Sequence, residues 1–502
     1  MKNTKIWTFL LVVILILQAA AEALTTAIVL QLDMLPGKFV AVLVVVMVFL
    51  LLLMGAFMFL PIGGKVGKSR RITACILALL IVAGCALVSN VVAKAYNTVN
   101  NVTNTDTTNN TRDMYIFVRT EDTAQKISDT KGYTFAAIEN YNMELTEKVL
   151  EHVKEAIGEA PTVNYYQQNT LLADALFAGD VDALIMNGAT AALLIEEEAY
   201  ENFFDKARIL ATIPYESLKE QENTQATEGE EHDITNTPFV VYVSGSDTRS
   251  SVLAVSRSDV NILMVVNPVT KQVLLLNTPR DYYVPNPAGD GALDKLTHCG
   301  LYGVDCSMEA LENLYGTKIE HYGQINFTGF ETLINAIGGI TVYSDQAFTT
   351  GNTKIQKGEN FLNGSQALAF ARERYRVNGG DNGRGKNQMK VITAVIEKMT
   401  SGATIISNYS SIMKSLEGTF STSLQMSDIS NLVKMQLSDM ASWNVYSFAV
   451  FGTGGSETTY SSPGVKAYVM HPDQDVVDYA GELIQKVLDG EILTKDDVTY
   501  SK

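Results

Sequence analysis

Three long apolar runs occupy the first 95 residues, and they constrain the fold of this chain more than any other feature. They span about Trp7–Leu30, Phe39–Leu60 and Ile72–Val92. A helix needs about 20 apolar residues to cross the hydrocarbon core of a bilayer, and each run is long enough. A single run could be a buried core helix, but three in succession predict a membrane anchor of three transmembrane helices over residues 1–95.

Basic residues flank these runs unevenly. They precede the first run and fill the connection between the second and third, at Lys2, Lys5, Lys65, Lys68, Arg70 and Arg71. The positive-inside rule then predicts a cytoplasmic N-terminus and places everything after about residue 95 outside the cell. The first run also resembles a signal peptide with small residues at Ala19–Ala23, and its cleavage would leave that location unchanged. We therefore expect a multi-pass protein of the cell membrane.

Charge is distributed as unevenly as hydrophobicity. Residues 1–95 hold 8 Lys or Arg and 2 Asp or Glu, so 38 − 8 = 30 basic and 55 − 2 = 53 acidic residues remain, a net charge of −23 on residues 96–502. An acidic outer part argues against nucleic acid as a partner, since binding to phosphates needs a basic face. The 47% of hydrophobic residues argues against disorder.

Composition divides the outer part into four segments. Residues 96–112 are rich in Asn and Thr and predict a flexible stalk, and residues 216–236 predict an acidic linker. Between them, residues 113–215 predict a small accessory α/β domain. Residues 237–502 are long enough for a complete core and carry every motif with recognisable chemistry.

Strand and helix patterns alternate in both domains, which predicts an α/β layer fold. In the accessory domain the predicted strands are Met114–Val118, Thr162–Tyr166 and Val181–Met186, and the helices Met143–Ile157 and Leu171–Phe177. In the C-terminal domain the strands are Phe239–Val243, Asn261–Val266 and Val273–Asn277, and the helices Met308–Tyr315, Gly329–Ile337 and Gln388–Met399.

Arginine and aspartate gather where these strands begin and end. The clusters are Asp247 and Arg249, Arg257 and Asp259, Arg280 and Asp281, and a Gly-rich stretch with Arg372, Arg374, Arg376, Asp381, Arg384, Lys386 and Gln388. Ligand sites of open α/β sheets collect at strand ends, so we expect several clusters to share one crevice. Arginine forks match phosphate oxygens, and paired carboxylates hold Mg²⁺ together with substrate phosphates. Each pair taken alone could equally be a surface ion pair.

The C-terminal domain resembles the LytR–CpsA–Psr (LCP) family, and most of all its capsule-type CpsA members. The resemblance rests on DTRSSVLAVSRSDVNIL, LLLNTPRDYYV, KLTHCGLYGVD, ALENLYG, INFTGFETLINAIGGI and LNGSQALAFARERYRVNGGDNGRGKNQMKVI, in this order over residues 239–400. It implies an α-β-α layered domain with a mixed central sheet. It also implies an extracytoplasmic phosphotransferase that moves a glycopolymer, usually capsular polysaccharide, from an undecaprenyl-pyrophosphate carrier to peptidoglycan.

The resemblance also implies roles for individual residues. Asp247 and Asp259 would hold Mg²⁺, with Mn²⁺ as the alternative ion. The pyrophosphate would be bound by Arg257, Arg280, Arg372, Arg374, Arg384 and Gln388. The prenyl tail would lie in an apolar tunnel between sheet and helices. Many members have an Arg-Gln pair near the end of this motif, where this chain reads Gly-Lys-Asn-Gln. Lys386 could supply charge there but not a fork.

Asp381 is the candidate base for the acceptor hydroxyl. A carboxylate among arginines is expected to have a depressed pKa, so Asp381 would be ionised but weakly basic. Its alternative role is to orient Arg384 or Arg374. The alternative role of Asp281 is likewise to orient Arg280. A local ion pair is the simplest account of Glu373.

Two further functions remain open on the sequence. A regulatory or scaffolding protein of capsule assembly would bind the lipid-linked precursor without transferring it, and its partners would include capsule export and assembly proteins. A lipid-pyrophosphate hydrolase would use the same residues with water as the acceptor. Cys299 and Cys306 allow either a disulfide or two free thiols, and His298 beside them lacks the further ligands of a zinc site.

Overall fold

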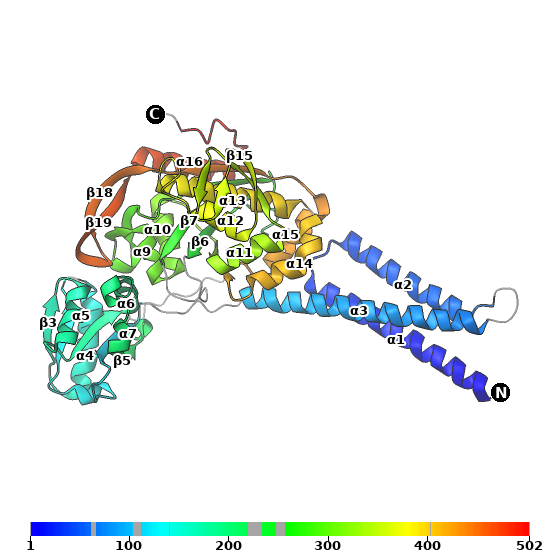
Figure 1. Ribbon diagram of the computed structural model, residues 1–502, viewed down its shortest axis with the longest axis horizontal. Helices are drawn as coiled ribbons and strands as arrows, with labels where there is room; N and C mark the ends of the chain where they lie inside the picture. The colour runs from blue at the N-terminus through cyan, green and yellow to red at the C-terminus, as the bar shows by residue number, and fades with distance from the viewer. Residues whose placement is uncertain are drawn as a thin grey trace.

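The computed structural model describes residues 2–61, 67–103, 112–139, 141–218, 233–246, 257–401 and 403–500. Three parts follow one another along its long axis (Figure 1). The anchor helices project at one end, the C-terminal domain lies in the middle, and the accessory domain lies at the other end.

The anchor consists of α1 (Lys2–Leu32), α2 (Gly37–Phe59) and α3 (Lys68–Thr103). All three helices are long and apolar enough to cross a membrane, as the apolar runs predict. Helix α3 continues past the bilayer length, so residues 96–103 of the predicted flexible stalk are helical. Its sequence there contains no Gly or Pro, and Tyr96 packs beside Val92 in an apolar cluster with helices of the C-terminal domain. Residues 104–111 lie outside the described part of the chain.

The accessory domain contains a mixed sheet in the order β3-β2-β4-β1-β5. Its strands are β1 (Met114–Arg119), β2 (Thr134–Ile138), β3 (Thr162–Tyr166), β4 (Ala183–Asn187) and β5 (Ala207–Ile213). Its helices are α4 (Met143–Ile157), α5 (Asn169–Ala178), α6 (Gly188–Leu194), α7 (Phe203–Lys206) and α8 (Tyr215–Leu218), with short 3₁₀ turns η1 (Ile127–Thr130) and η2 (Glu198–Tyr200). Helix α8 occupies the start of the predicted acidic linker, of which residues 219–232 lie outside the described part.

The C-terminal domain is built on a mixed sheet in the order β16-β11-β6-β7-β8-β17. The strands are β6 (Phe239–Ser246), β7 (Ser258–Asn267), β8 (Gln272–Asn277), β11 (His321–Asn326), β16 (Phe420–Thr422) and β17 (Asn444–Ala449). β7 is antiparallel to both β6 and β8, whereas β11 and β17 add on in parallel. The expected α/β fold with a mixed central sheet is confirmed.

Helices cover both faces of this sheet because its strands are apolar on both sides. Val240 and Tyr242 of β6 face one core, whereas Phe239 and Val241 face another. The first core is closed by α9 (Leu296–Cys299), α10 (Val304–Tyr315) and α16 (Gln474–Leu488). The second is closed by α13 (Asp381–Thr400) and α15 (Met426–Asp439).

Helices α11 (Phe327–Ala336), α12 (Gly364–Arg372) and α14 (Ala403–Leu416) contribute to a further apolar cluster beside α13. Helix α14 packs against both α11 and the anchor helix α3, so it joins the C-terminal domain to the anchor (Figure 1). The remaining elements are short hairpins and turns: β9 (Tyr283–Asn286), β10 (Ala292–Lys295), β12 (Ile340–Ser344), β13 (Phe348–Thr350), β14 (Thr353–Ile355), β15 (Gly358–Leu362), β18 (Gly452–Thr459), β19 (Ser462–Pro472), η3 (Pro287–Gly289) and η4 (Gly300–Tyr302).

Candidate active site

The sheet brings two of the predicted charged clusters together at one edge. Arg257 precedes β7, Asp259 is near its start, and Arg280 follows the end of the antiparallel neighbour β8. The Arg280 guanidinium donates through Nη1 to Asp259 Oδ1 at 2.7 Å. The two clusters meet because β7 and β8 are antiparallel neighbours, so the start of β7 lies beside the end of β8. Asp247, the other predicted metal ligand, lies outside the described residues, as does Arg249.

Asp281 orients the arginine beside it. Its Oδ2 lies 3.6 Å from Arg280 Nε, and its Oδ1 lies 3.2 Å from Lys295 Nζ. Arg280 is therefore held between the carboxylates of Asp259 and Asp281, and its charge is partly compensated when no ligand is present. A phosphate that enters would compete with these carboxylates for the guanidinium.

A second group of arginines follows helix α12. Arg372 is its last residue, and its guanidinium lies 4.2 Å from the centre of the Phe327 ring. The buried Glu373 fixes the next turn: its carboxylate accepts from the backbone N–H groups of Tyr375 and Arg376 and from the Arg376 side chain. Burial opposes its ionisation, but these bonds and one from Thr350 leave the pKa of Glu373 below its usual range. The expected local ion pair of Glu373 is thus present.

Helix α13 carries the last group, and it begins at Asp381, seven residues before the predicted start. Gly385 allows this: a Cβ there would lie 2.3 Å from Asn277 Nδ2, so only glycine lets α13 approach the end of β8 so closely. Arg384 and Gln388 are four residues apart and share one helix face. Lys386 lies on another face and is exposed.

These elements enclose a cleft of about 700 Å³. Six of the predicted site residues line it, namely Asp259, Arg280, Arg372, Arg374, Arg384 and Gln388. Arg374 also lies over the ring of Tyr375, 4.6 Å from its centre. The described residues that line the cleft do not include Arg257, Asp381 or Lys386. Asp381 lies directly behind the cleft, against the side chain of Arg384.

An apolar cavity of about 100 Å³ adjoins the cleft. It lies between β6, β7 and β11 on one side and α11, α12 and α13 on the other, and its apolar lining includes Val243, Val260, Ile325, Phe327, Phe330, Leu368, Ala371, Val391 and Ile392. Arg372 and Gln388 line both spaces. The site therefore combines a cationic chamber with an apolar one, and Arg372 stands at the boundary.

The pKa of Asp381 corrects an expectation from the sequence. A depressed value was expected because arginines surround this residue, but burial raises the pKa of Asp381, helped by the nearby Asp281 and Asp259. Arg384 and Arg280 offset this only in part. Asp381 Oδ1 lies 2.5 Å from Arg384 Nη2, yet the two groups lack the alignment of a hydrogen bond. A carboxylate with a raised pKa is a stronger base than we expected.

Arg257 has a partner that the sequence did not reveal. Its Nη2 donates to Glu196, a residue of the accessory domain. Burial, and repulsion from the neighbouring Arg280, lower the pKa of Arg257, although a guanidinium remains charged at any working pH. Glu196 sits in the run Glu196–Glu198, which looks like an ordinary solvated charge cluster, so no signal in the sequence linked it to the site.

Other cleft residues were also missed. The hairpin of β13 and β14 contributes Thr350 and Asn352, and α11 contributes Phe327 and Glu331. Phe327 lies within the quoted stretch INFTGF, but its cation–π contact with Arg372 depends on a fold that brings residues 45 positions apart together. Polar residues of a hairpin carry no pattern that distinguishes a site wall from any other loop.

The carboxylates of the cleft can be compared with the ligands that Mg²⁺ prefers. Among the described residues, no group of three or more His, Cys, Asp or Glu side chains could hold a metal ion. Asp259 nevertheless offers a carboxylate at the wall of a cleft lined by arginines. That donor suits Mg²⁺, which is often bound by one or two carboxylates together with substrate phosphates.

Cys299 and Cys306 are both free thiols and lie buried in the core of the C-terminal domain. Cys306 Sγ donates to Asn286 Oδ1 at 3.3 Å. His298 Nδ1 lies 2.6 Å from the buried carboxylate of Asp294, which accounts for this histidine without a metal. Of the two states that the sequence left open, the structure has the free thiols.

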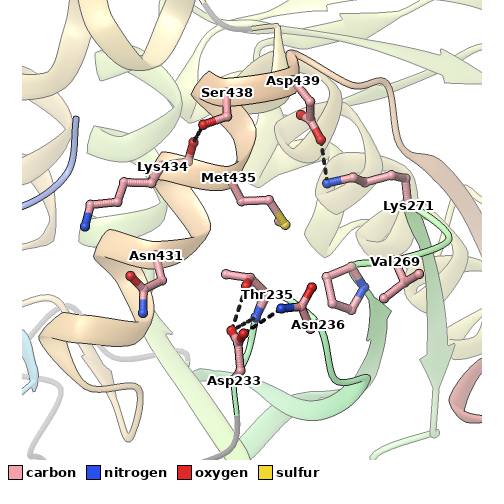
Figure 2. A pocket seen from close by; sticks show the side chains of 11 residues that line it. Asp233, Thr235, Asn236, Val269, Lys271, Asn431, Lys434, Met435, Ser438 and Asp439 are labelled. Carbon is pink, nitrogen blue, oxygen red and sulfur yellow. Dashed lines mark hydrogen bonds and ion pairs between the residues drawn. The ribbon is translucent and has the colours of Figure 1, made fainter. Parts of the chain in front are cut away.

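A second polar cavity, of about 650 Å³, lies at the opposite end of the sheet (Figure 2). Its two lysines are both paired. Lys271 Nζ lies 2.9 Å from Asp439 Oδ2 (Figure 2). Lys434 Nζ lies 2.6 Å from Asp33 Oδ2 in the connection between α1 and α2. Lys38 Nζ also donates to the backbone oxygen of Ser438 at 2.7 Å. This region is where the C-terminal domain meets the anchor.

Comparison with known proteins identifies the family to which this chain belongs. Named relatives include the polyisoprenyl-teichoic acid–peptidoglycan teichoic acid transferases TagU of Enterococcus faecalis and Bacillus licheniformis. The first is 36% identical over 197 residues, 39% of this chain and 64% of the relative, and the second is 32% identical over 234 residues, 46% and 73% of the two chains. The match to the Enterococcus protein thus spans less than two thirds of that protein's length.

Solved structures with some likeness include TagV of Bacillus subtilis, with a TM-score of 0.43 and 26% identity over 51% of this chain and 98% of that chain. A structure described as TagT bound to LIIa-WTA gives a TM-score of 0.42 and 26% identity over 52% and 94%. The LytR_cpsA_psr family model matches residues 209–474, more than half of the 502 residues. The chain therefore belongs to the LytR_cpsA_psr family.

Proposed function

We propose that this protein transfers a glycopolymer from a polyprenyl-pyrophosphate carrier to peptidoglycan. The observation that carries the proposal is the arginine-lined cleft that adjoins an apolar cavity, with Arg372 and Gln388 lining both. A polyprenyl pyrophosphate has the matching form, because a strongly anionic head is joined directly to an apolar chain. The named relatives, described as teichoic acid transferases, act in the same class of reaction.

The cationic side chains bind the head group and stabilise the leaving group. Arg280, Arg372, Arg374 and Arg384 line one cleft, so their guanidinium groups can approach a pyrophosphate together. Negative charge grows on the phosphate that leaves with the prenyl chain, and fixed cations stabilise that charge without reorganisation. Gln388 adds an uncharged hydrogen-bonding group at the boundary with the apolar cavity.

Asp381 serves as the base. The hydroxyl oxygen of a peptidoglycan sugar attacks the phosphorus that bears the glycan, and the bond from this phosphorus to the bridging oxygen breaks. Polyprenyl phosphate leaves, the glycan phosphate is joined to peptidoglycan, and Asp381 accepts the hydroxyl proton. The raised pKa of Asp381 supports this assignment, because a base close in pKa to the working pH is more effective.

Asp259, and Asp247 outside the described residues, would hold Mg²⁺, or Mn²⁺ in its place. The ion supplies charge neutralisation at the phosphate oxygens. Asp259 also accepts a hydrogen bond from Arg280, so the carboxylate that would hold the ion positions this guanidinium as well.

A reaction at the outer face of the cell membrane fits an anchor of three membrane-length helices. Helix α14 packs on α3 and on α11, and α11 contributes Phe327 and Phe330 to the apolar cavity. A prenyl chain held in the bilayer is thereby kept near its binding cavity. The basic residues at the N-terminus and between α2 and α3 support an extracellular C-terminal domain.

The finer substrate assignment is capsular polysaccharide on an undecaprenyl carrier. Its support is the similarity of the C-terminal motifs and of the anchor–accessory arrangement to capsule-type members of the family. The named relatives instead act on teichoic acid, so the polymer is the part of the proposal that a direct assay decides. Capsule export and assembly proteins are the partners that this assignment implies.

The test uses the full chain in lipid nanodiscs with an undecaprenyl-pyrophosphate oligosaccharide, Mg²⁺ and a peptidoglycan fragment, followed by mass spectrometry. We expect a sugar–phosphate–peptidoglycan adduct, which Arg280→Ala and Arg372→Ala abolish. Lys386→Ala is the matched control, because Lys386 is exposed on α13 and does not line the described part of the cleft. Capsule and teichoic acid fragments are supplied in parallel to identify the polymer.

Each other outcome contradicts a stated part of the proposal. A free phosphorylated sugar without an adduct would identify a hydrolase. Lipid binding without any turnover of either polymer would identify a regulatory or scaffolding protein. An adduct that survives both arginine substitutions would place the chemistry elsewhere in the chain.

A further inference from the structure

The accessory domain reaches the candidate active site through helix α6. Ala189 and Leu193 of α6 belong to the same buried apolar cluster as Val240 and Tyr242 of the central sheet. Hydrogen bonds stabilise the same junction. The Tyr141 and Tyr302 hydroxyl oxygens lie 2.8 Å apart, and the Tyr302 hydroxyl oxygen lies 2.9 Å from Ser461 Oγ. The docking of α6 is therefore part of the core, and the residues that follow this helix have a defined position.

Glu196 follows α6 by two residues and pairs with Arg257. The two side chains remain 37% and 35% exposed, so water reaches the pair and the two groups can separate. An ion pair with this exposure is weak enough for a ligand to displace, unlike a fully buried pair.

Among the described residues, two further carboxylates, Asp259 and Asp281, act on Arg257, and both already have another partner. Asp259, two residues along the chain, already accepts from Arg280 at 2.7 Å, and Asp281 lies between Arg280 and Lys295. Among the described residues that line the cleft, Asp259 and Arg280 are present and Arg257 is absent. The contact with Glu196 thus directs the Arg257 guanidinium towards the accessory domain and away from the cleft.

We infer that Glu196 is a positioning residue that competes with the substrate pyrophosphate for Arg257. In the ligand-free protein the Glu196 carboxylate holds the guanidinium at the domain junction, and a pyrophosphate in the cleft must draw it away. The accessory domain thereby sets the affinity of the site for its anionic ligand. This inference rests on the proposed function, because it takes the cleft to be a pyrophosphate site.

The test measures binding of geranylgeranyl pyrophosphate to the full chain in detergent micelles by isothermal titration calorimetry. Glu196→Gln keeps the size of the side chain and removes its charge. We expect the dissociation constant to fall by about two- to fivefold, the range that an exposed ion pair allows. Glu198→Gln is the matched control, because Glu198 is an exposed neighbour on the η2 turn.

A double-mutant cycle shows whether Glu196 acts through Arg257. In an Arg257→Ala background, Glu196→Gln should leave the dissociation constant unchanged, because no guanidinium remains to compete for. Glu196→Ala serves as a second variant, and thermal unfolding of each protein verifies that the domains remain folded. A general loss of negative charge would instead give the same gain in both backgrounds and in Glu198→Gln.

The outcomes separate this inference from the proposed function. Absence of probe binding by the unmodified protein would contradict the proposed function, and this inference with it. Probe binding that Glu196→Gln leaves unchanged or weakens would overturn the inference alone. A gain that persists without Arg257 would also overturn it.

Discussion

Three arginines in or beside the cleft lie against carboxylates. Arg280 pairs with Asp259, Arg384 lies against Asp381, and Arg257 meets Glu196. These carboxylates offset the charge of three of the arginines, and a pyrophosphate would compete for the same guanidinium groups. The site can therefore hold several arginines close together without the cost of isolated buried cations.

The pH dependence of transfer should reveal the raised pKa of Asp381. A base must be deprotonated, so activity should fall with decreasing pH on a limb that lies above the ordinary Asp pKa of about 3.9. Arg384→Gln removes a cation that lowers this pKa, and the limb should move to higher pH. The measurement is kcat/KM against pH for both proteins. A limb that moves to lower pH, or that persists in Asp381→Asn, would exclude Asp381 as the base.

Arg372 should not be replaceable by lysine. Its planar guanidinium lies over the Phe327 ring and faces both chambers, and a lysine has neither the fork nor the flat surface. Arg372→Lys should weaken geranylgeranyl pyrophosphate binding by about tenfold, a typical loss for a stacked, bidentate contact. Titration calorimetry gives this value, with Lys386→Arg as the control for the reverse exchange. Unchanged affinity in Arg372→Lys would remove Arg372 from the head-group contacts.

Helices position these residues, and their exact limits depend on contacts that no local pattern reveals. The sequence predicted the central strands and the main helices, because their apolar periodicity is strong. It placed the start of α13 too late, since Gly379, Gly380, Gly383 and Gly385 suggest a loop. The close approach to Asn277 makes the last of these glycines a packing residue. The sequence also missed the helical extension of α3, because Tyr96 is stabilised by helices that lie far away along the chain.

The packing of α13 against β8 can be tested at Gly385. Gly385→Ala would place a Cβ 2.3 Å from Asn277 Nδ2 and should push the helix away from the sheet. We expect a loss of about 1–3 kcal/mol in the free energy of unfolding, as for other overpacked sites. Chemical denaturation of the purified protein measures this loss. Asn277→Ala should recover part of it in the double variant, and full additivity of the two losses would show that the clash is absent.

The whole molecule joins a bilayer anchor, an amphiphilic site and an accessory domain in one continuous set of contacts. Helix α14 packs on the anchor helix α3 and on α11, which lines the apolar cavity, and Glu196, just after α6, contacts Arg257. Composition predicts the same three parts, and the phosphate site that the charged clusters suggest stays a prediction. The link between Glu196 and Arg257 was not predictable, because docking of two domains leaves no periodic signal in either sequence segment.

The distribution of basic residues predicts an extracellular C-terminal domain, and this orientation can be checked in intact cells. Lys386 is exposed on α13, and the native Cys299 and Cys306 are buried. A Lys386→Cys variant should react with a membrane-impermeant maleimide added outside the cells, whereas the unmodified protein should react little. Labelling that appears only after the membrane is permeabilised would place the C-terminal domain inside the cell and contradict the proposed location.

The central claim is that the arginine cleft and the apolar cavity form one site for a polyprenyl pyrophosphate, and a chain-length series tests it most directly. Affinities of the full chain for pyrophosphate, isopentenyl pyrophosphate and geranyl pyrophosphate would be compared with those of Ala371→Leu, which fills part of the apolar cavity. One buried methylene contributes about 0.8 kcal/mol, so an isoprene unit should raise affinity by at least about tenfold.

We predict that Ala371→Leu retains the affinity for pyrophosphate and loses most of the gain from the prenyl chain. Equal affinity of the unmodified protein for all three ligands, or an equal loss for all three in the variant, would contradict the claim that the two chambers bind one lipid.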